Sequence, residues 1–250
     1  MGRGLICAIC AVGVKFSGHP NRRDLEVQLT TEAKRLLKAD LENGGLENLQ
    51  TCILLSTLSA GNCETSSEAL YVRIATSMAE ILHLHTSTIG GSIIARKTAA
   101  RIWWSLYIAD RWCFSGLGIP RHMDDVGGFL RLPLDEDTFR SLPPDQNIPN
   151  VPYKQGLWAY MITLVRLFGP IQGLNRRFAF GDTDITELDQ TVVNLGQKLE
   201  TWNGMLPVEI QFTIANLHSH QHNGLGGPFI ALHLAYHHYS TLLYFRFLED

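Results

Sequence analysis

The stretch from Arg101 to Pro133 constrains the fold most, because it places a carboxylate in the middle of an apolar helix face. It reads RIWWSLYIADRWCFSGLGIPRHMDDVGGFLRLP, an aromatic-rich helix followed by a Gly-x-Gly-x-Pro turn and an acidic loop. At about 100° per residue, Asp110 shares a face with Ile102 and Leu106. An ionised carboxylate there is costly unless it is paired or hydrogen-bonded. We therefore expect the turn at residues 116–122 to supply hydrogen bonds to it.

The same helix offers two interpretations of its polar pair. Trp104 and Arg111 project away from the apolar face, so the helix is covered on more than one side, as at the centre of a bundle. A ligand held there would contact apolar walls and two charged groups, namely Trp103, Trp104, Tyr107, Asp110 and Arg111. The alternative is a structural carboxylate that fixes the following loop, and we favour this second interpretation.

Helical spacing recurs along the rest of the chain, and no strand is predicted. The other predicted helices cover residues 5–16, 25–41, 46–61, 65–84, 156–176, 185–202 and 228–248. Two of them have the spacing of a capping box, Thr65 with Glu68 and Asp184 with Glu187. We predict an all-α fold, a multi-helix bundle of antiparallel helix pairs without a significant sheet.

A segment rich in Pro, Asp and Asn separates two helical parts of the chain. It includes the adjacent Pro143 and Pro144, which favour a loop over any continuous helix. We divide the chain into an N-terminal part at 1–133, a loop or linker at 134–155, and a C-terminal helical part at 156–250.

Composition narrows the function classes. The formal net charge is -3 and the basic residues form no dense stripe, so the chain has no nucleic-acid footprint of its own. No apolar run reaches the roughly 18 residues of a membrane span, and we expect no membrane contact. The odd number of five dispersed cysteines favours a reducing compartment. We place the Cys7-x-x-Cys10 pair on an ordinary buried first helix, although its apolar run imitates a signal peptide.

Residue types suited to chemistry occur without the patterns that chemistry needs. His218, His220 and His222 alternate in a segment that we expect to be a loop, while His233 and His237 are one helical turn apart without an accompanying Glu. We therefore expect no metal site. The chain contains neither a Gly-x-Ser-x-Gly elbow nor a P-loop, and its adjacent acids fall in loops, so we expect no enzyme.

Several stretches together resemble the fungal-specific transcription factor domain, the middle homology region of zinc binuclear cluster regulators. The most specific is RIWWSLYIADRWCFSGLGIPRHMDD, which is similar to the family's Trp-Trp-x-Leu-Tyr-x-x-Asp-Arg and Gly-x-Pro signature. LGQKLETWNGMLP resembles its Leu-x-x-Trp-x-x-x-Leu-Pro element, and YVRIATSMAEILHLH its helix ending in Met-Ala-x-x-Leu-Gly-Leu-His, with His83 where glycine is common. The signature positions are Gly118, Pro120, Asp124, Trp202 and Pro207.

The resemblance implies a nuclear regulator of fungal metabolism or of a biosynthetic gene cluster. In the family, DNA is bound by a separate zinc cluster with six cysteines, which the dispersed cysteines of this chain cannot build. The resemblance thus implies no cofactor in this chain and only indirect contact with DNA. It also implies a small-molecule effector, and a second copy or a co-regulator as partner. The alternative is a helical domain recruited as a biosynthetic-pathway enzyme or a small-molecule binding protein.

Overall fold

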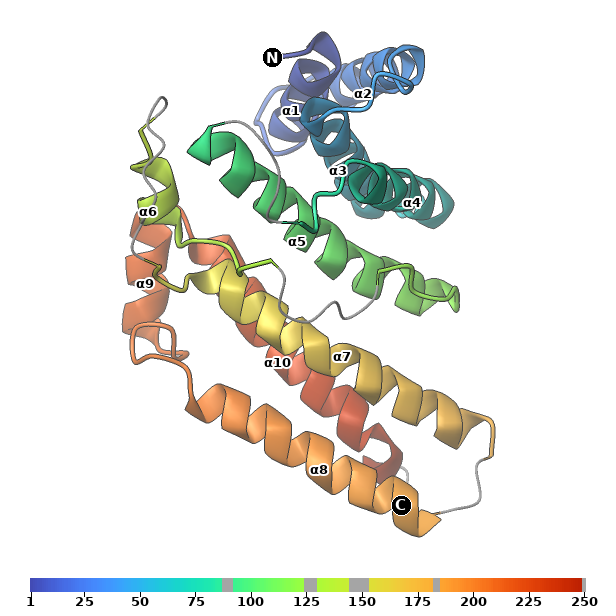
Figure 1. Ribbon diagram of the computed structural model, residues 1–250, viewed down its shortest axis with the longest axis vertical. Coiled ribbons are helices and arrows are strands. Elements are labelled where there is room, and N and C mark those ends of the chain that lie inside the picture. Colours follow the sequence, from blue (N-terminus) through green and yellow to red (C-terminus); the bar gives the residue numbers. More distant parts are fainter. Residues whose placement is uncertain (87–91, 124–129, 144–152, 182–184, 249–250) are drawn as a thin grey trace. The chain divides into compact units, whose positions relative to one another are not determined.

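The computed structural model describes residues 1–86, 92–123, 130–143, 153–181 and 185–248 (Figure 1). Within these ranges the regular structure is helical, apart from one isolated antiparallel bridge between Leu134 and Gln155. The fold is all-α, and the prediction of its class is confirmed. The chain divides into two compact units, one of Met1–Arg131 with Leu142–Pro149 and the other of Leu132–Ser141 with Asn150–Asp250.

The described residues of unit 1 form five helices. They are α1 (Arg3–Lys15), α2 (Arg22–Ala39), α3 (Leu46–Gly61), α4 (Thr65–Ile81) and α5 (Ile93–Leu117). The first helix packs against α2 and α3, and α5 packs against α3 and α4. Small residues allow the close approach of α1 to α2, since Ala8 and Ala11 are fully buried. A Cβ atom at Gly4 would lie 3.5 Å from the Cβ of Leu36. The apolar N-terminal run is therefore a packed helix, as predicted.

The two ends of α4 are capped by backbone hydrogen bonds and not by side chains. The helix starts at Thr65, and its N-cap residue Glu64 makes no capping hydrogen bond through its side chain. The prediction of a capping box at Thr65 is wrong, because this threonine is already inside the helix. At the other end the His83 amide donates to Glu80 O and the Leu84 amide to Ala79 O. This is the Schellman pattern, with His83 at a φ of 53° in the left-handed region.

Unit 2 begins with the bridge and a short helix and continues as a helical layer. Its elements are α6 (Glu136–Arg140), α7 (Leu157–Ala179), α8 (Ile185–Gly204), α9 (Ile214–His222), α10 (Gly226–Tyr244) and the 3-10 helix η1 (Phe245–Leu248). Helix α10 packs against α7, α8 and α9, and α7 packs against α8 (Figure 1). Asp135 caps α6 by accepting a hydrogen bond of 3.2 Å from the Thr138 amide.

Two features of unit 2 differ from the sequence-based expectation. The segment predicted as a loop contains α6, which is too short for helical periodicity to reveal. His218, His220 and His222 lie on α9 and not in a loop. Pro170 lies inside α7, as the predicted helix over residues 156–176 requires. The predicted capping residue Asp184 lies outside the described residues.

Helix α7 is long and apolar enough to cross a membrane by length and composition alone. Of its most apolar window, 56% is buried inside the protein. Core helices of globular folds meet the same criterion, so the length and composition of α7 are weak evidence for a membrane span.

Candidate functional site

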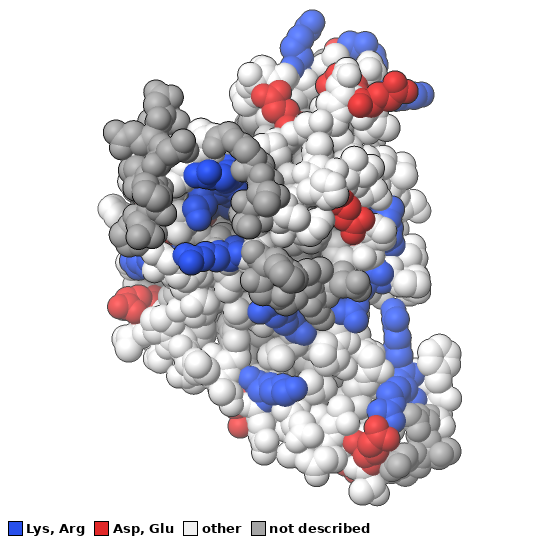
Figure 2. Space-filling model, viewed as in Figure 1, with Lys and Arg blue, Asp and Glu red and all other residues white. Residues whose placement is uncertain are grey.

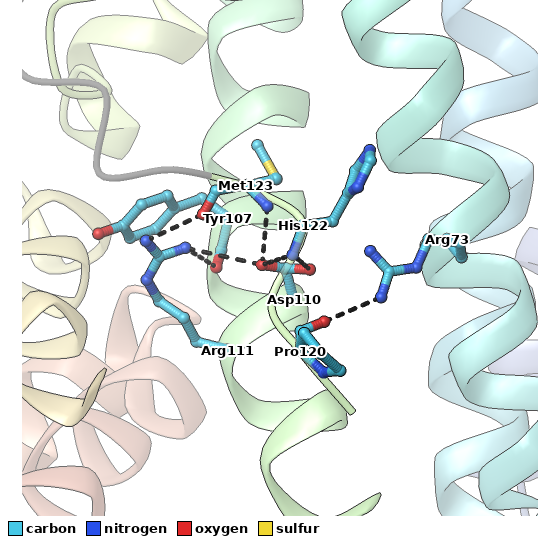
Figure 3. Close-up of polar contacts among 7 residues, drawn as sticks. All are labelled: Arg73, Tyr107, Asp110, Arg111, Pro120, His122 and Met123. Atoms are coloured by element: carbon cyan, nitrogen blue, oxygen red, sulfur yellow. Dashed lines mark hydrogen bonds and ion pairs between the residues drawn. The ribbon is translucent and has the colours of Figure 1, made fainter. Parts of the chain in front are cut away.

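The centre of unit 1 holds Asp110 on α5, whose side chain is fully buried. The carboxylate accepts hydrogen bonds from the His122 amide, at 3.0 and 3.2 Å to its two oxygens, and from the Met123 amide at 3.1 Å (Figure 3). These bonds replace the water lost on burial and so offset the desolvation of the charge. The donors were expected at residues 116–122, and the structure places them at the end of that turn and one residue beyond it.

Arg111 completes the buried network by binding the backbone carbonyl of Met123, the residue whose amide Asp110 binds. Its guanidinium donates to the carbonyl of Met123 and to that of Tyr107, each at 3.4 Å. Its Cζ lies 3.3 Å from the centre of the Tyr107 ring, a cation–π contact. A guanidinium nitrogen lies 3.9 Å from the Asp110 carboxylate. Met123 is thus bound at its backbone N–H by an anion and at its backbone C=O by a cation.

Helix α4 contributes two further contacts to the loop that follows α5. Arg73 donates to the carbonyl of Pro120 at 3.1 Å (Figure 3). Glu80 pairs with the ring of His122 at 2.9 Å. We call residues 118–123 the clasp loop, because α4 and α5 hold it from both sides. Gly118 begins the clasp loop at a φ of +66°, which a residue with a side chain rarely adopts.

The remaining candidate ligand residues are also buried. The Trp104 indole N–H donates to Arg131 O at 3.2 Å, and its ring lies 5.2 Å from that of Tyr107. The Trp103 ring instead lies 5.3 Å from the ring of His85. The structure therefore joins Trp104, Tyr107, Asp110 and Arg111 in one set of contacts and leaves Trp103 beside a different partner. Trp104, Asp110 and Arg111 each make hydrogen bonds to the backbone of the segment after α5, which supports a structural role.

Cys113 lies on α5 one turn after Asp110 and packs against Ala69 and Val72 of α4. Burial, followed by the nearby carboxylate of Glu68, raises the pKa of its thiol to about 12. A thiol with such a pKa stays protonated at neutral pH and is a poor nucleophile. The residue therefore contributes to packing between α4 and α5.

Two signature positions of unit 2 lie at the end of α8. The indole N–H of Trp202 donates to Thr163 Oγ1 on α7 at 2.9 Å, and its ring stacks on Tyr236 of α10 at 5.8 Å. Pro207 accepts hydrogen bonds from the amides of Ile210 and Gln211 in the turn after α8. The signature position Asp124 lies outside the described residues.

An open pocket of about 550 Å³ lies between α7 and α8. The residues that line it include Leu167, Lys198, Trp202 and Met205. Sequence reasoning did not find it, because its two walls come from helices that the chain pattern alone does not place side by side. The available signal was the polar stripe of Asn194, Gln197, Lys198 and Thr201 on α8, beside Trp202.

The histidines of α9 and α10 hold the turn between α8 and α9. The ring of His233 lies 2.9 Å from Ile210 O, and that of His220 lies 3.1 Å from Glu209 O. Burial lowers the pKa of His233, although its hydrogen bond to Ile210 acts in the opposite direction. Among the described residues, no three His, Cys, Asp or Glu side chains are placed to share a metal ion.

Comparisons with known proteins agree with these features. The sequence profile of the fungal specific transcription factor domain matches residues 3–203. A transcriptional regulatory protein of Schizosaccharomyces pombe is 23% identical, over 94% of this chain and 28% of its own length. A Saccharomyces cerevisiae protein named as a transcriptional regulatory protein is 24% identical, over 81% of this chain and 28% of its own length. No solved structure matches the chain.

The described part of the chain is thus an all-helical domain in which a buried Asp-Arg network holds the clasp loop. The profile covers most of the chain, including unit 2 as far as residue 203, so the chain belongs to the fungal-specific transcription factor domain family. It spans just over a quarter of the length of the two relatives, 28% in each case.

Proposed function

We propose that this chain is the regulatory domain of a fungal transcriptional regulator that acts in the nucleus. The observation that carries the proposal is the profile match over residues 3–203, together with two relatives that are named as transcriptional regulatory proteins. Its targets are genes of metabolism or of a biosynthetic gene cluster. The domain senses an effector or a partner, such as a co-regulator or a second copy, and has no catalytic activity of its own.

Contact with DNA is made through a separate zinc cluster module and not by these residues. The face shown in Figure 2 supports this separation of roles, since charged side chains of both signs are scattered among mostly uncharged residues. The net charge of -3 points in the same direction, because affinity for DNA depends on Lys and Arg that neutralise phosphates.

In unit 1, the clasp loop and the buried charged side chains that bind it have a structural role. Asp110 and Arg111 are positioning residues, which hold the loop after α5 at a fixed place on α4 and α5. The aromatic residues around them complete the packing. The signature residues of unit 1 therefore maintain the fold of the regulatory domain and do not bind a substrate.

Deletion of the gene in its host tests the proposal. RNA sequencing should show changed levels of a defined set of transcripts, and chromatin immunoprecipitation of the tagged protein should recover the promoters of that set. Unchanged transcripts, together with loss of a metabolite in the deletion strain, would instead favour the alternative of a biosynthetic-pathway enzyme or binding protein.

A further inference from the structure

The pocket between α7 and α8 has the features of a ligand site. Its volume of about 550 Å³ lies within the roughly 300–1,000 Å³ that small-molecule sites occupy. It lies wholly inside unit 2, so its walls are set by two helices that pack directly on each other. We propose that this groove binds a small organic acid with an apolar body.

One wall of the groove is a tryptophan whose ring is held in place. The Trp202 N–H donates to Thr163 Oγ1, and the Thr163 hydroxyl in turn donates to Tyr160 O at 2.8 Å. The ring also stacks on Tyr236. Because its rotation is restrained by a hydrogen bond and by stacking, little conformational entropy is lost when a ligand packs on it.

The apolar body of the ligand would rest on the other hydrophobic groups of the groove. Leu167 on α7 is half-buried, while Met205 at the end of α8 is 75% exposed. A flexible thioether of this kind adapts to ligands of different shape. Together with the Trp202 ring, these side chains form a surface suited to an aromatic or alicyclic group.

The charge of the ligand follows from Lys198, which lies one helical turn before Trp202 and lines the same groove. Lys198 forms no ion pair with any residue that the structure describes. An ammonium beside an apolar wall complements an amphiphilic carboxylate, and its flexible stem allows it to follow the acid group. The neighbouring lining residues Gln197 and Thr201 can add hydrogen bonds.

The role of this ligand as an effector rests on the proposed function. The binding itself does not depend on that function. The experiment therefore measures binding on the purified full chain, independently of transcription. If binding fails while deletion still changes transcripts, this inference is wrong and the proposed function stands. If binding succeeds and transcripts do not change, the inference stands and the proposed function is wrong.

The probe is 2-naphthoate, titrated into the ¹⁵N-labelled chain and followed by NMR. With about 13 non-hydrogen atoms, it should bind with a dissociation constant of about 1 mM or tighter. The Trp202 indole N–H resonance and the amides of α7 and α8 near the groove should shift in a saturable manner. Small, non-saturating shifts spread over the surface would overturn the proposal.

Charge recognition is tested by Lys198→Gln, which keeps much of the stem and removes the ammonium. The variant should bind 2-naphthoate at least about threefold more weakly, while its affinity for the neutral 2-naphthylmethanol should not change. Lys154→Gln is the matched control, since Lys154 is an exposed lysine of the same unit outside the groove. Equal binding of the acid by the wild type and K198Q would contradict the assignment of Lys198.

A second variant tests the position of the site. Thr201→Trp should fill the groove from an exposed position on α8 and abolish the saturable shifts, without loss of the helical circular dichroism signal. If T201W bound 2-naphthoate as tightly as the wild type, the ligand would lie elsewhere and the groove would be excluded.

Discussion

Asp110 holds His122 by its backbone, with both carboxylate oxygens within 3.2 Å of the same amide. The ring of His122 also pairs with Glu80 on α4 at 2.9 Å. One residue of the clasp loop therefore connects the buried centre of α5 with the neighbouring helix. The buried carboxylate organises this connection, because the loop has no regular secondary structure of its own to satisfy its amides.

Asp110→Ala should lower the free energy of unfolding of unit 1 by about 3 kcal/mol. The change leaves two loop amides without the carboxylate that accepts from them and removes the anion 3.9 Å from the buried Arg111, and both losses are destabilising. Urea denaturation measures the effect. Hydrogen exchange of the His122 and Met123 amides should accelerate more than that of amides in α1 or α2.

The control for this change is Glu42→Ala, which removes an exposed carboxylate from the same unit. It should leave the urea midpoint nearly unchanged. If Asp110→Ala kept wild-type stability and yet abolished a ligand response, the residue would have a direct role in binding and the structural interpretation would be wrong.

The need for a polar partner at Asp110 was predictable, because a carboxylate at the centre of an apolar helix face cannot stay unsatisfied. The identity of the partners was only partly predictable. Sequence separation favours the loop directly after α5, and that loop supplies both amides. Arg73 and Glu80 come from α4, and nothing in the local pattern indicates that these two side chains face the same loop.

His83→Gly should stabilise unit 1 by about 1 kcal/mol. His83 occupies the left-handed position of the Schellman pattern at the end of α4, with a φ of 53°. Glycine adopts this conformation without the steric cost of a Cβ atom. Thermal unfolding followed by circular dichroism measures the change, and a lower melting temperature for H83G would show that contacts of the His83 ring outweigh the backbone strain.

The helices with long apolar periodicity were predictable from sequence, and α3 begins and ends at the predicted residues. The features that were missed are short or depend on tertiary contacts. The five residues of α6 cannot show a helical period, and the helix is set by its cap at Asp135. The nine residues of α9 contain alternating histidines, a pattern that hides a helix whose His220 ring contacts Glu209 O in the preceding turn.

Gly156→Ala should destabilise unit 2 by about 1–3 kcal/mol, because overpacking at a backbone contact forces the chain apart. A Cβ atom at Gly156 would lie 2.7 Å from the Cα of Asp135, beside the Leu134–Gln155 bridge.

The control is Gly173→Ala on α7, the same substitution at a site where it should stabilise the unit. A Cβ atom there meets nothing within 4 Å, so the better helix propensity of alanine should stabilise by about 0.5–1 kcal/mol. Equal effects of the two changes on urea unfolding would contradict the close contact.

Unit 2 should lose stability as the pH falls below about 6.5, and His233 should account for part of the loss. Burial lowers the pKa of this imidazole in the folded chain, whereas the unfolded chain keeps a value of about 6.5. Between these two pKa values the unfolded state binds the extra proton, so lowering the pH favours unfolding. Nearby His220 and His237 act in the same direction when they are charged.

His233→Gln isolates this contribution, because the amide nitrogen of glutamine can still donate to Ile210 O and does not titrate. Urea midpoints measured between pH 7.5 and 5.5 should fall less steeply for H233Q than for the wild type. His218→Gln removes an exposed histidine of α9 and should keep the wild-type slope. If H233Q and H218Q lost stability equally with falling pH, the buried His233 would not be the group responsible, and the titration of the exposed histidines would explain the slope instead.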